Sequence, residues 1–325
     1  MDDTQTKIPQ SQPSRLKKIW RLYGRTFALF LAMTGGALFP EGQAASGLVP
    51  YLLMGMLFFA FLDISFTRES FHPSILGIFL ANLAVPFAVY FLIRGLDPDL
   101  ALVGFLTAIA PTATATPVIV SYLRGRVDYV LPIVLVTNIG IALILPFALP
   151  WVAGASVHIT TMEILPSVLL VMFVPLGLAF FLRKFLPSVQ RFLLPVKAVS
   201  FPIWLLMLFI VMSKASAFLQ TNSGTTAVRL TWIALIALVS CILNFALGAW
   251  IGGPRFRQEA SQSLGQKNNS FTIWIALTYL NPLAALGPTF YVLYHNLYNG
   301  FQLVQYERTS GSSIPADPPL RQPEK

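Results

Sequence analysis

The sequence predicts an all-α polytopic membrane protein of about ten transmembrane helices, and three observations carry this prediction. Of the 325 residues, 55% are hydrophobic and 11% are charged, whereas a soluble domain carries about 25% charged residues. Apolar stretches of about 20 residues, the length that crosses a bilayer, recur along the chain. Two of these stretches are interrupted by polar residues at matching places.

The apolar stretches place one transmembrane domain at residues 21–306. The expected spans are residues 24–40, 49–66, 74–94, 100–122, 128–152, 163–182, 197–219, 230–252, 258–280 and 283–304. Residues 1–20 form a polar N-terminal tail without the apolar region of a signal peptide. Residues 307–325 are rich in Pro, Ser and charge and are expected to be a disordered tail.

Charge placement predicts the orientation. In the ten-span arrangement, 18 of the 22 lysines and arginines fall on one side. Arg94 and Arg229 fall on the other side, and Lys214 and Lys267 lie within or at the edge of spans. The positive-inside rule then puts both termini in the cytoplasm of an integral plasma (inner) membrane protein. Because this distribution also accounts for the net charge of +9, it predicts membrane lipid as a partner and no nucleic acid.

The first interruption is the segment Pro111-Thr-Ala-Thr-Ala-Thr-Pro117. Each proline removes a backbone donor and disfavours helical angles in the residue before it. We expect the helix to unwind and restart here, with hydroxyl groups from Thr112, Thr114 and Thr116 and with free N–H groups that could hold an anion. The alternative is a plain proline kink, in which the threonines bond back to the preceding turn.

The second interruption is Gly265-Gln-Lys-Asn-Asn-Ser270. A charged side chain at bilayer depth costs about 2.5–3.5 kcal/mol, so Lys267 is expected to be functional. Glu259 is the nearest acid and would need Ser263 or water to reach Lys267. The alternative is a helix that begins later, with Lys267 extending to the cytoplasmic surface. The candidate binding residues of this segment are Ser263, Gln266, Lys267, Asn268, Asn269 and Ser270.

The two breaks divide the chain into halves of similar design. Each half, residues 24–152 and 163–304, has five spans with the break on the fourth. An odd number of spans per half inverts the second half relative to the first. We therefore expect two inverted repeats whose discontinuous helices, the fourth and the ninth, cross at mid-membrane around a hydrated site. This layout is typical of a secondary transporter.

Enzyme chemistry and cofactors are not expected. His72 and His158 fall in loops on opposite sides and His295 lies in the last span, so we expect no catalytic cluster. The one cysteine, Cys241, lies in an apolar span and cannot build a disulfide framework or a cysteine metal site.

The motifs resemble those of the bile acid:sodium symporter family, within the bile/arsenite/riboflavin transporter superfamily. Gly265 to Ser270, then Asn281-Pro-Leu-Ala-Ala-Leu286 and Tyr294-His295-Asn296, resemble its ninth and tenth helices. Pro111 to Thr116, followed by Arg124-Gly-Arg126, is similar to the break and turn of its fourth helix. Asn82 with Pro86 is similar to a Gln and Pro on its third helix, one residue closer together.

The resemblance implies a core of helices three to five and eight to ten, and a panel of helices one, two, six and seven. Substrate would bind where the crossed breaks face the panel. Members of the family move organic anions inward with sodium.

The sodium-site pattern is where this chain departs. Ser263 stands where the family has a sodium-binding Glu, Lys267 where it has a Gln, and Pro117 where it has an Asn. Val130 and Val134 replace hydroxyl ligands, although Thr116 keeps one. We therefore expect no metal site, and sodium coupling is doubtful. The hypothesis is that the Lys267 ammonium stands in for the bound cation in a sodium-independent carrier of a small organic anion.

Two other functions remain open. A membrane sensor built on a carrier fold would bind the anion without moving it. An arsenite or metalloid exporter of the same superfamily would use a cysteine in the fourth helix, whereas Cys241 is in the eighth. Substrate identity, transport direction and oligomeric state stay open.

Overall fold

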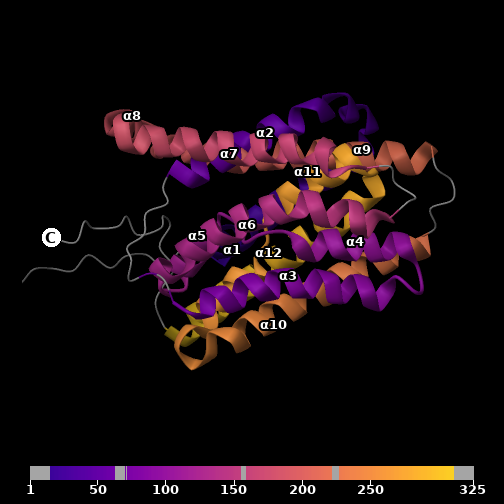
Figure 1. Ribbon diagram of the computed structural model, residues 1–325. Coiled ribbons are helices and arrows are strands. Elements are labelled where there is room, and N and C mark those ends of the chain that lie inside the picture. The colour runs from indigo at the N-terminus through magenta and orange to yellow at the C-terminus, as the bar shows by residue number, and fades with distance from the viewer. Residues whose placement is uncertain (1–14, 63–69, 71, 155–158, 222–226, 311–325) are drawn as a thin grey trace, which may run out of the picture.

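The computed structural model describes residues 15–62, 70, 72–154, 159–221 and 227–310. Within these ranges the regular elements are helices (Figure 1). They are α1 (Arg15–Leu38), η1 (Pro40–Leu48), α2 (Val49–Leu62), α3 (Ser74–Ile93), α4 (Pro98–Ile109), α5 (Thr116–Tyr122), α6 (Val127–Ala153), α7 (Thr161–Phe185), α8 (Pro187–Leu193), η4 (Pro195–Val199), α9 (Ser200–Thr221), α10 (Ala227–Gly265), α11 (Asn269–Tyr279) and α12 (Pro282–Ser310).

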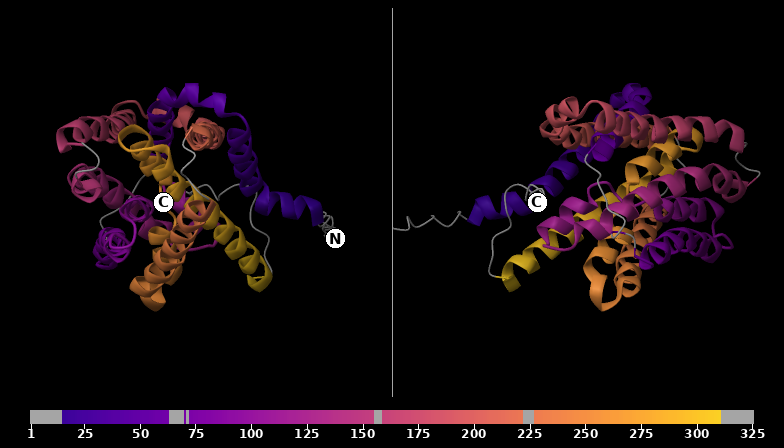
Figure 2. Two further views of the ribbon diagram at one scale, coloured as in Figure 1. Left: turned by 90° about the vertical axis from the view of Figure 1, so that its right-hand side faces the viewer. Right: turned by 60° about the vertical axis from the view of Figure 1, so that its left-hand side comes forward.

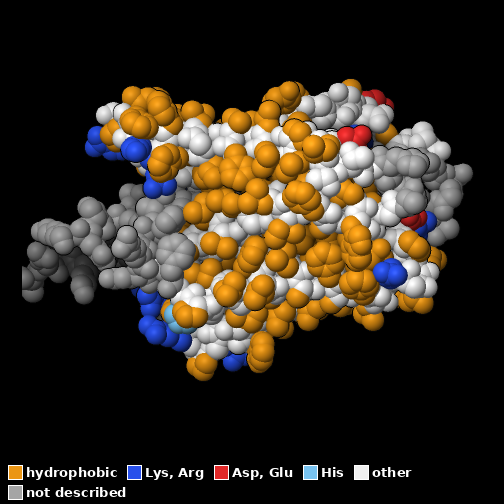
Figure 3. All heavy atoms as spheres, viewed as in Figure 1, with side chains coloured by type: hydrophobic (Ala, Val, Ile, Leu, Met, Phe, Trp, Pro, Cys, Tyr) orange, Lys and Arg blue, Asp and Glu red, His pale blue; other side chains and the backbone are white. Residues whose placement is uncertain are grey.

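Six stretches in the described part of the chain are long and apolar enough to cross a membrane. They are Pro40–Leu62, Ser74–Ile93, Val127–Ala153, Thr161–Phe185, Pro187–Thr221 and Ala227–Gly265. Hydrophobic side chains cover the lateral face of the molecule, and most of the basic side chains visible in Figure 3 lie near its two ends. The prediction of an all-helical polytopic membrane protein is confirmed. The count of ten crossings and the inverted repeat stay predictions.

The contacts between helices define two groups. In Figure 1, α2, α7 and α9 lie above α3, α4 and α10, and Figure 2 shows the helices from other sides. In the first group, α1 packs against α9 and α2 against α7; we call these four helices the panel. In the second group, α3 packs on α4, α12 packs on α4, α10 and α11, and α6 packs on α3 and α5. We call α3–α6 and α10–α12 the core bundle.

Helix α10 is a hairpin of two arms. Gly253 (φ 59°, ψ −162°) and Phe256 (φ −130°, ψ 28°) leave helical geometry. Beyond the turn the second arm packs back against the first. A contact between the arms shows this: the Ser261 hydroxyl donates to the Phe245 carbonyl at 2.8 Å. A Cβ atom on Gly248 would lie 2.5 Å from the Ala260 carbonyl oxygen. The close approach of the arms therefore requires glycine there, and the arms correspond to two separate expected spans.

Two helix ends differ from the expected boundaries. Helix α1 begins at Arg15, inside the segment assigned to the polar tail, since Leu16, Ile19 and Trp20 recur at helical spacing. Helix α12 continues to Ser310, past the expected boundary at residue 306, because the sequence carries no Gly or Pro after Gly300 until Gly311. His158 and residues 1–14 and 311–325 lie outside the described residues.

Candidate functional site

The two breaks lie against each other. The first separates α4 from α5, and the second separates α10 from α11. Thr112 and Lys267 form an isolated antiparallel bridge. Ala113 N–H donates to the Gln266 carbonyl at 2.8 Å, and Asn268 N–H donates to the Pro111 carbonyl at 2.7 Å. Each unwound segment thus satisfies backbone groups of the other, which lipid could not do.

Thr112 holds the first break in place from both sides. Its hydroxyl donates to the Ser263 carbonyl at 2.6 Å, and its N–H donates to the Thr137 hydroxyl at 3.1 Å. Its carbonyl accepts from Asn138 Nδ2 at 2.9 Å. Because Thr112 bonds to α10 and α6 rather than to the turn before it, the alternative of a plain proline kink is wrong for this residue.

Lys267 is buried, with 2% of its surface exposed. Its ammonium donates to Asn82 Oδ1 on α3. Asn82 Nδ2 in turn donates to the Ile109 carbonyl at the end of α4, at 3.4 Å. The alternative in which Lys267 extends to the cytoplasmic surface is therefore wrong. Instead, one amide group links the buried cation to the helix end that precedes the first break.

Glu259 does not pair with Lys267, which corrects the expectation for this acid. Its carboxylate accepts from the Arg126 N–H at 2.8 Å. It lies beside Gly125, where an added Cβ would come within 3.0 Å of Oε1. Glu259 therefore braces the turn between α5 and α6. Lys267 forms no ion pair with a carboxylate in the described residues, and Asn82 is the hydrogen-bond partner of its amine.

The other predicted polar residues fall into three groups. The Ser263 hydroxyl donates to the Glu259 carbonyl of its own helix at 2.8 Å, so Ser263 contacts the first break through its backbone carbonyl and not through its hydroxyl. Asn268 Nδ2 donates to Asn138 Oδ1 at 3.2 Å and ties the second break to α6. A third group is buried with one side-chain oxygen that has no protein partner among the described residues: Thr116 Oγ1, Gln266 Oε1 and Asn269 Oδ1.

Thr114 is half-buried in the first break and Ser270 is buried in the first turn of α11. Neither helix restart has a side-chain cap, so α11 begins with backbone N–H groups that a ligand could use. Buried polar atoms normally have a partner, so each of the three unpaired oxygens marks a place where water or a ligand with a hydrogen-bond donor would fit.

The helix-breaking residues act as expected from their chemistry. Pro117 lies in the first turn of α5, where a missing N–H costs no helical bond. The Pro111 carbonyl accepts from the second break. A Cβ atom on Gly265 would lie 2.3 Å from the Phe245 ring, so no larger residue fits without movement of that ring.

His295 and Asn296 are not brought to the crossing. Asn296 Nδ2 donates to the Val292 carbonyl of its own helix at 2.7 Å. His295 is buried against Tyr291, with ring centroids 5.8 Å apart. Tyr291 links it to the break, because the Tyr291 hydroxyl donates to the Gly265 carbonyl at 2.7 Å.

Two residues outside the predicted set hold the site together. Tyr291 carries no signal in the sequence that separates it from other aromatic residues of α12. Lys214 does carry such a signal in the sequence, because it is a charged residue within an apolar span. From α9 of the panel its amine donates to the Leu277 carbonyl near the end of α11 at 3.2 Å, a favourable place for a cation. Lys214 thus joins panel to core bundle.

Several positions where the family pattern has sodium ligands offer no free side-chain oxygen. A hard cation needs several oxygen ligands. Val130 and Val134 are fully buried and offer none. The Ser263 hydroxyl is bonded to Glu259, and Asn82 Oδ1 already accepts from the Lys267 ammonium.

Apolar helices around two interrupted helices whose breaks bond to each other define a polytopic membrane protein of the transporter class. A model of the sodium bile acid symporter family matches residues 47–222, more than half of the chain, and the protein belongs to this family. The matched region contains the first break and ends before the second. The uncharacterized protein YbaS of Bacillus subtilis (strain 168) is 25% identical over 249 residues, which are 72% of this chain and 80% of YbaS.

Proposed function

We propose that the protein is a secondary transporter that moves a small organic anion by alternating access without sodium. Family membership supports transport of the bile acid symporter type. The buried Lys267 ammonium, bonded to Asn82, is the observation that carries the sodium-independent proposal. Asn82 and Lys267 stand at two positions where the family pattern has glutamine. The Lys267 ammonium would supply there the positive charge that a bound sodium ion supplies in the family pattern.

Electrostatics favours this exchange of roles. Two unit positive charges about 4 Å apart repel by about 4 kcal/mol at an effective dielectric of 20. A sodium ion beside the Lys267 ammonium would therefore bind poorly, whereas a carboxylate or sulfonate would be attracted. The proposed anion site comprises the Lys267 amine and the backbone N–H groups at the uncapped start of α11, which are hydrogen-bond donors.

Alternating access requires two parts that move relative to each other, and the helix packing supports an inverted repeat of ten spans. Under such a repeat, α1 corresponds to α7 and α2 to α9. The contact of α1 with α9 then has its counterpart in the contact of α2 with α7, and both occur. The contacts of α4 with α12 and of α6 with α10 form a second such pair. The antiparallel bridge between the breaks fits the same symmetry.

The proposed orientation keeps both termini in the cytoplasm. Arg183 and Lys184 end α7 on that side, and Arg126 there pairs with Asp128 at 2.8 Å. On the opposite side Arg229 pairs with Asp99 at 2.6 Å.

Transport in proteoliposomes tests the proposal. Labelled pantoate, a 2-keto acid and taurocholate would be offered with and without a sodium gradient. We expect at least one of them to be taken up at a rate that does not change with sodium. A strong sodium requirement would contradict the proposal. Saturable binding without flux would instead favour the sensor.

Lys267→Gln restores the residue of the family pattern and removes the fixed charge. We expect this variant to lose much of its sodium-independent uptake and to gain a response to sodium. Lys214→Gln is the matched control, because it removes the other intramembrane lysine that bonds to a carbonyl. This control should stay insensitive to sodium.

A further inference from the structure

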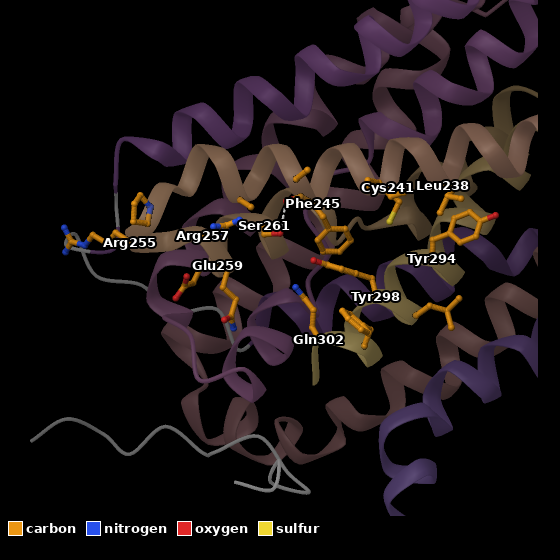
Figure 4. Close-up of a pocket in the computed structure, with 17 residues that line it drawn as sticks. Leu238, Cys241, Phe245, Arg255, Arg257, Glu259, Ser261, Tyr294, Tyr298 and Gln302 are labelled. Atoms are coloured by element: carbon orange, nitrogen blue, oxygen red, sulfur yellow. Dashed lines mark hydrogen bonds between the residues drawn. The ribbon is translucent and has the colours of Figure 1, made fainter. Parts of the chain in front are cut away.

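A cavity of ≈ 940 Å³ is lined by the two arms of α10 and by α12 (Figure 4). None of its lining residues belongs to residues 111–117 or 265–270, the two breaks. Leu238, Ile242 and Phe245 of the first arm and Leu297 and Phe301 of α12 give it an apolar wall. Arg255 and Arg257 lie at its other end, beside the turn of the hairpin.

The cavity opens sideways from the helix bundle. Ile242 is 61% exposed and Phe301 is 57% exposed, although both belong to helices of a membrane protein. Apolar side chains that are exposed at this depth face lipid. The wall from Leu238 to Ala249 is about 16 Å long at 1.5 Å per residue. This length is about half of a hydrocarbon core of about 30 Å, which is the depth of one leaflet.

The polar end of the cavity is positively charged. Arg255 and Arg257 are exposed, and neither pairs with a carboxylate in the described part of the chain. The Arg255 guanidinium lies 5.1 Å from the centroid of the Phe256 ring, and Glu259, the acid that lines the cavity, is held by the Arg126 N–H. Guanidinium groups bind phosphate oxygens with paired hydrogen bonds.

We propose that this cavity binds one anionic phospholipid of the surrounding membrane, with an acyl chain along the apolar wall and the phosphate against Arg255 and Arg257. A soluble organic anion would use the two arginines but leave the apolar wall uncovered. A zwitterionic lipid would cover the wall but add a positive group beside the arginines. Of these three ligands, only an anionic lipid both covers the apolar wall and places a net negative charge against the two arginines. The inference rests on the membrane setting and does not require transport.

Such a lipid would contact Phe245, which in turn packs against the second break. Phe245 lines the cavity, and the same ring packs against Gly265 at the start of the break. The bound chain would therefore restrict the movement of Phe245 away from Gly265.

Native mass spectrometry of the purified full-length protein tests whether Arg255 and Arg257 select an anionic headgroup. The protein would be mixed with equal amounts of phosphatidylglycerol and phosphatidylcholine that carry the same acyl chains. We expect one phosphatidylglycerol to be retained preferentially. In the Arg255→Gln, Arg257→Gln double variant this preference should fall about thirtyfold, the effect of two basic side chains near a membrane surface. Arg183→Gln with Lys184→Gln, the basic pair that ends α7, should leave it unchanged.

The acyl part has its own test. Ala246 lines the cavity, so Ala246→Phe should reduce retention of both lipids. Val239→Phe, on the same arm at an exposed position outside the lining, should not. Equal preference in the Arg255/Arg257 variant and its control would overturn the proposal. So would displacement of the lipid by glycerol 3-phosphate, or a protein dimer that dissociates in Ala246→Phe, because the occupant would then be a soluble anion or a second copy.

Discussion

The buried side-chain amide of Asn82 is the hydrogen-bond partner that stabilises the Lys267 amine at the crossed breaks. The Lys267 ammonium is removed from water, and Asn82 Oδ1 gives it a neutral partner rather than a countercharge. A buried charge without any hydrogen bond is costly, so this contact decides whether Lys267 is tolerated at this depth. With Lys267 protonated the site has a net positive charge, which the proposed transport of an anion requires.

Removal of Asn82 should therefore destabilise the protein. We expect Asn82→Leu to lower the free energy of unfolding by about 1.5–3 kcal/mol, the value of a hydrogen bond to a charged group. Adding Lys267→Met to the Asn82→Leu variant should recover most of that loss, because both polar partners are then replaced by apolar groups. The melting temperature of the detergent-purified variants, measured by thermal-shift fluorescence, checks this order.

Asn244→Leu is the matched control. It deletes a buried amide that donates to the Tyr291 hydroxyl at 3.3 Å and has no direct hydrogen bond with Lys267. Lys267→Met should not rescue it. If Lys267→Met lowered the melting temperature equally in both backgrounds, the contact between Asn82 and Lys267 would have no special part in stability.

At the scale of elements, the hairpin of α10 brings the second break into the core bundle. The reversal at Gly253 turns the chain back after the first arm, so that Gly265 ends against Phe245 and next to the first break. A continuous helix of 39 residues would instead extend about 58 Å and carry Lys267 far from Asn82.

The turn depends on a backbone conformation that only glycine adopts easily. Gly253 has φ 59° and ψ −162°, and a side chain in this region costs roughly 1–3 kcal/mol. We expect Gly253→Ala to lower the melting temperature and to reduce organic-anion uptake, since it strains the hairpin that positions Lys267.

Gly177→Ala provides the comparison. Gly177 lies in α7, and an added Cβ there would meet no atom within 4 Å. Alanine is favoured over glycine within helices by about 0.5–1 kcal/mol, so this variant should be unchanged or slightly more stable. Equal melting temperatures for Gly253→Ala and Gly177→Ala would show that the turn is not under conformational constraint.

For the whole molecule, the charge distribution predicts which end faces the cytoplasm. Ser188 in α8 and Gly95 after α3 are both exposed, and they lie on opposite sides of the ten-span arrangement. In a Cys241→Ser background, a cysteine at Gly95 should react with a membrane-impermeant maleimide on intact cells. A cysteine at Ser188 should react only in inside-out vesicles. Labelling of both from the same side would contradict the predicted topology.

The amino-acid pattern was sufficient for the membrane setting, the two breaks and the candidate cation. Apolar run length, proline and glycine act locally, so residues 111–117 and 265–270 could be identified without knowledge of their neighbours. The sequence indicates Asn82 and Lys267 as candidate residues, but it does not indicate their contact, because they lie 185 residues apart and meet only after the helices pack.

Packing settled the remaining assignments. Glu259 is at helical spacing from Ser263 and Lys267, yet its carboxylate bonds to Arg126 because the hairpin places α10 beside the turn after α5. His295 and Asn296 carry a family motif but face their own helix and Tyr291. Hydrophobicity selects which residues enter the membrane, whereas hydrogen bonds between distant segments select their partners, and those depend on the three-dimensional arrangement of the helices.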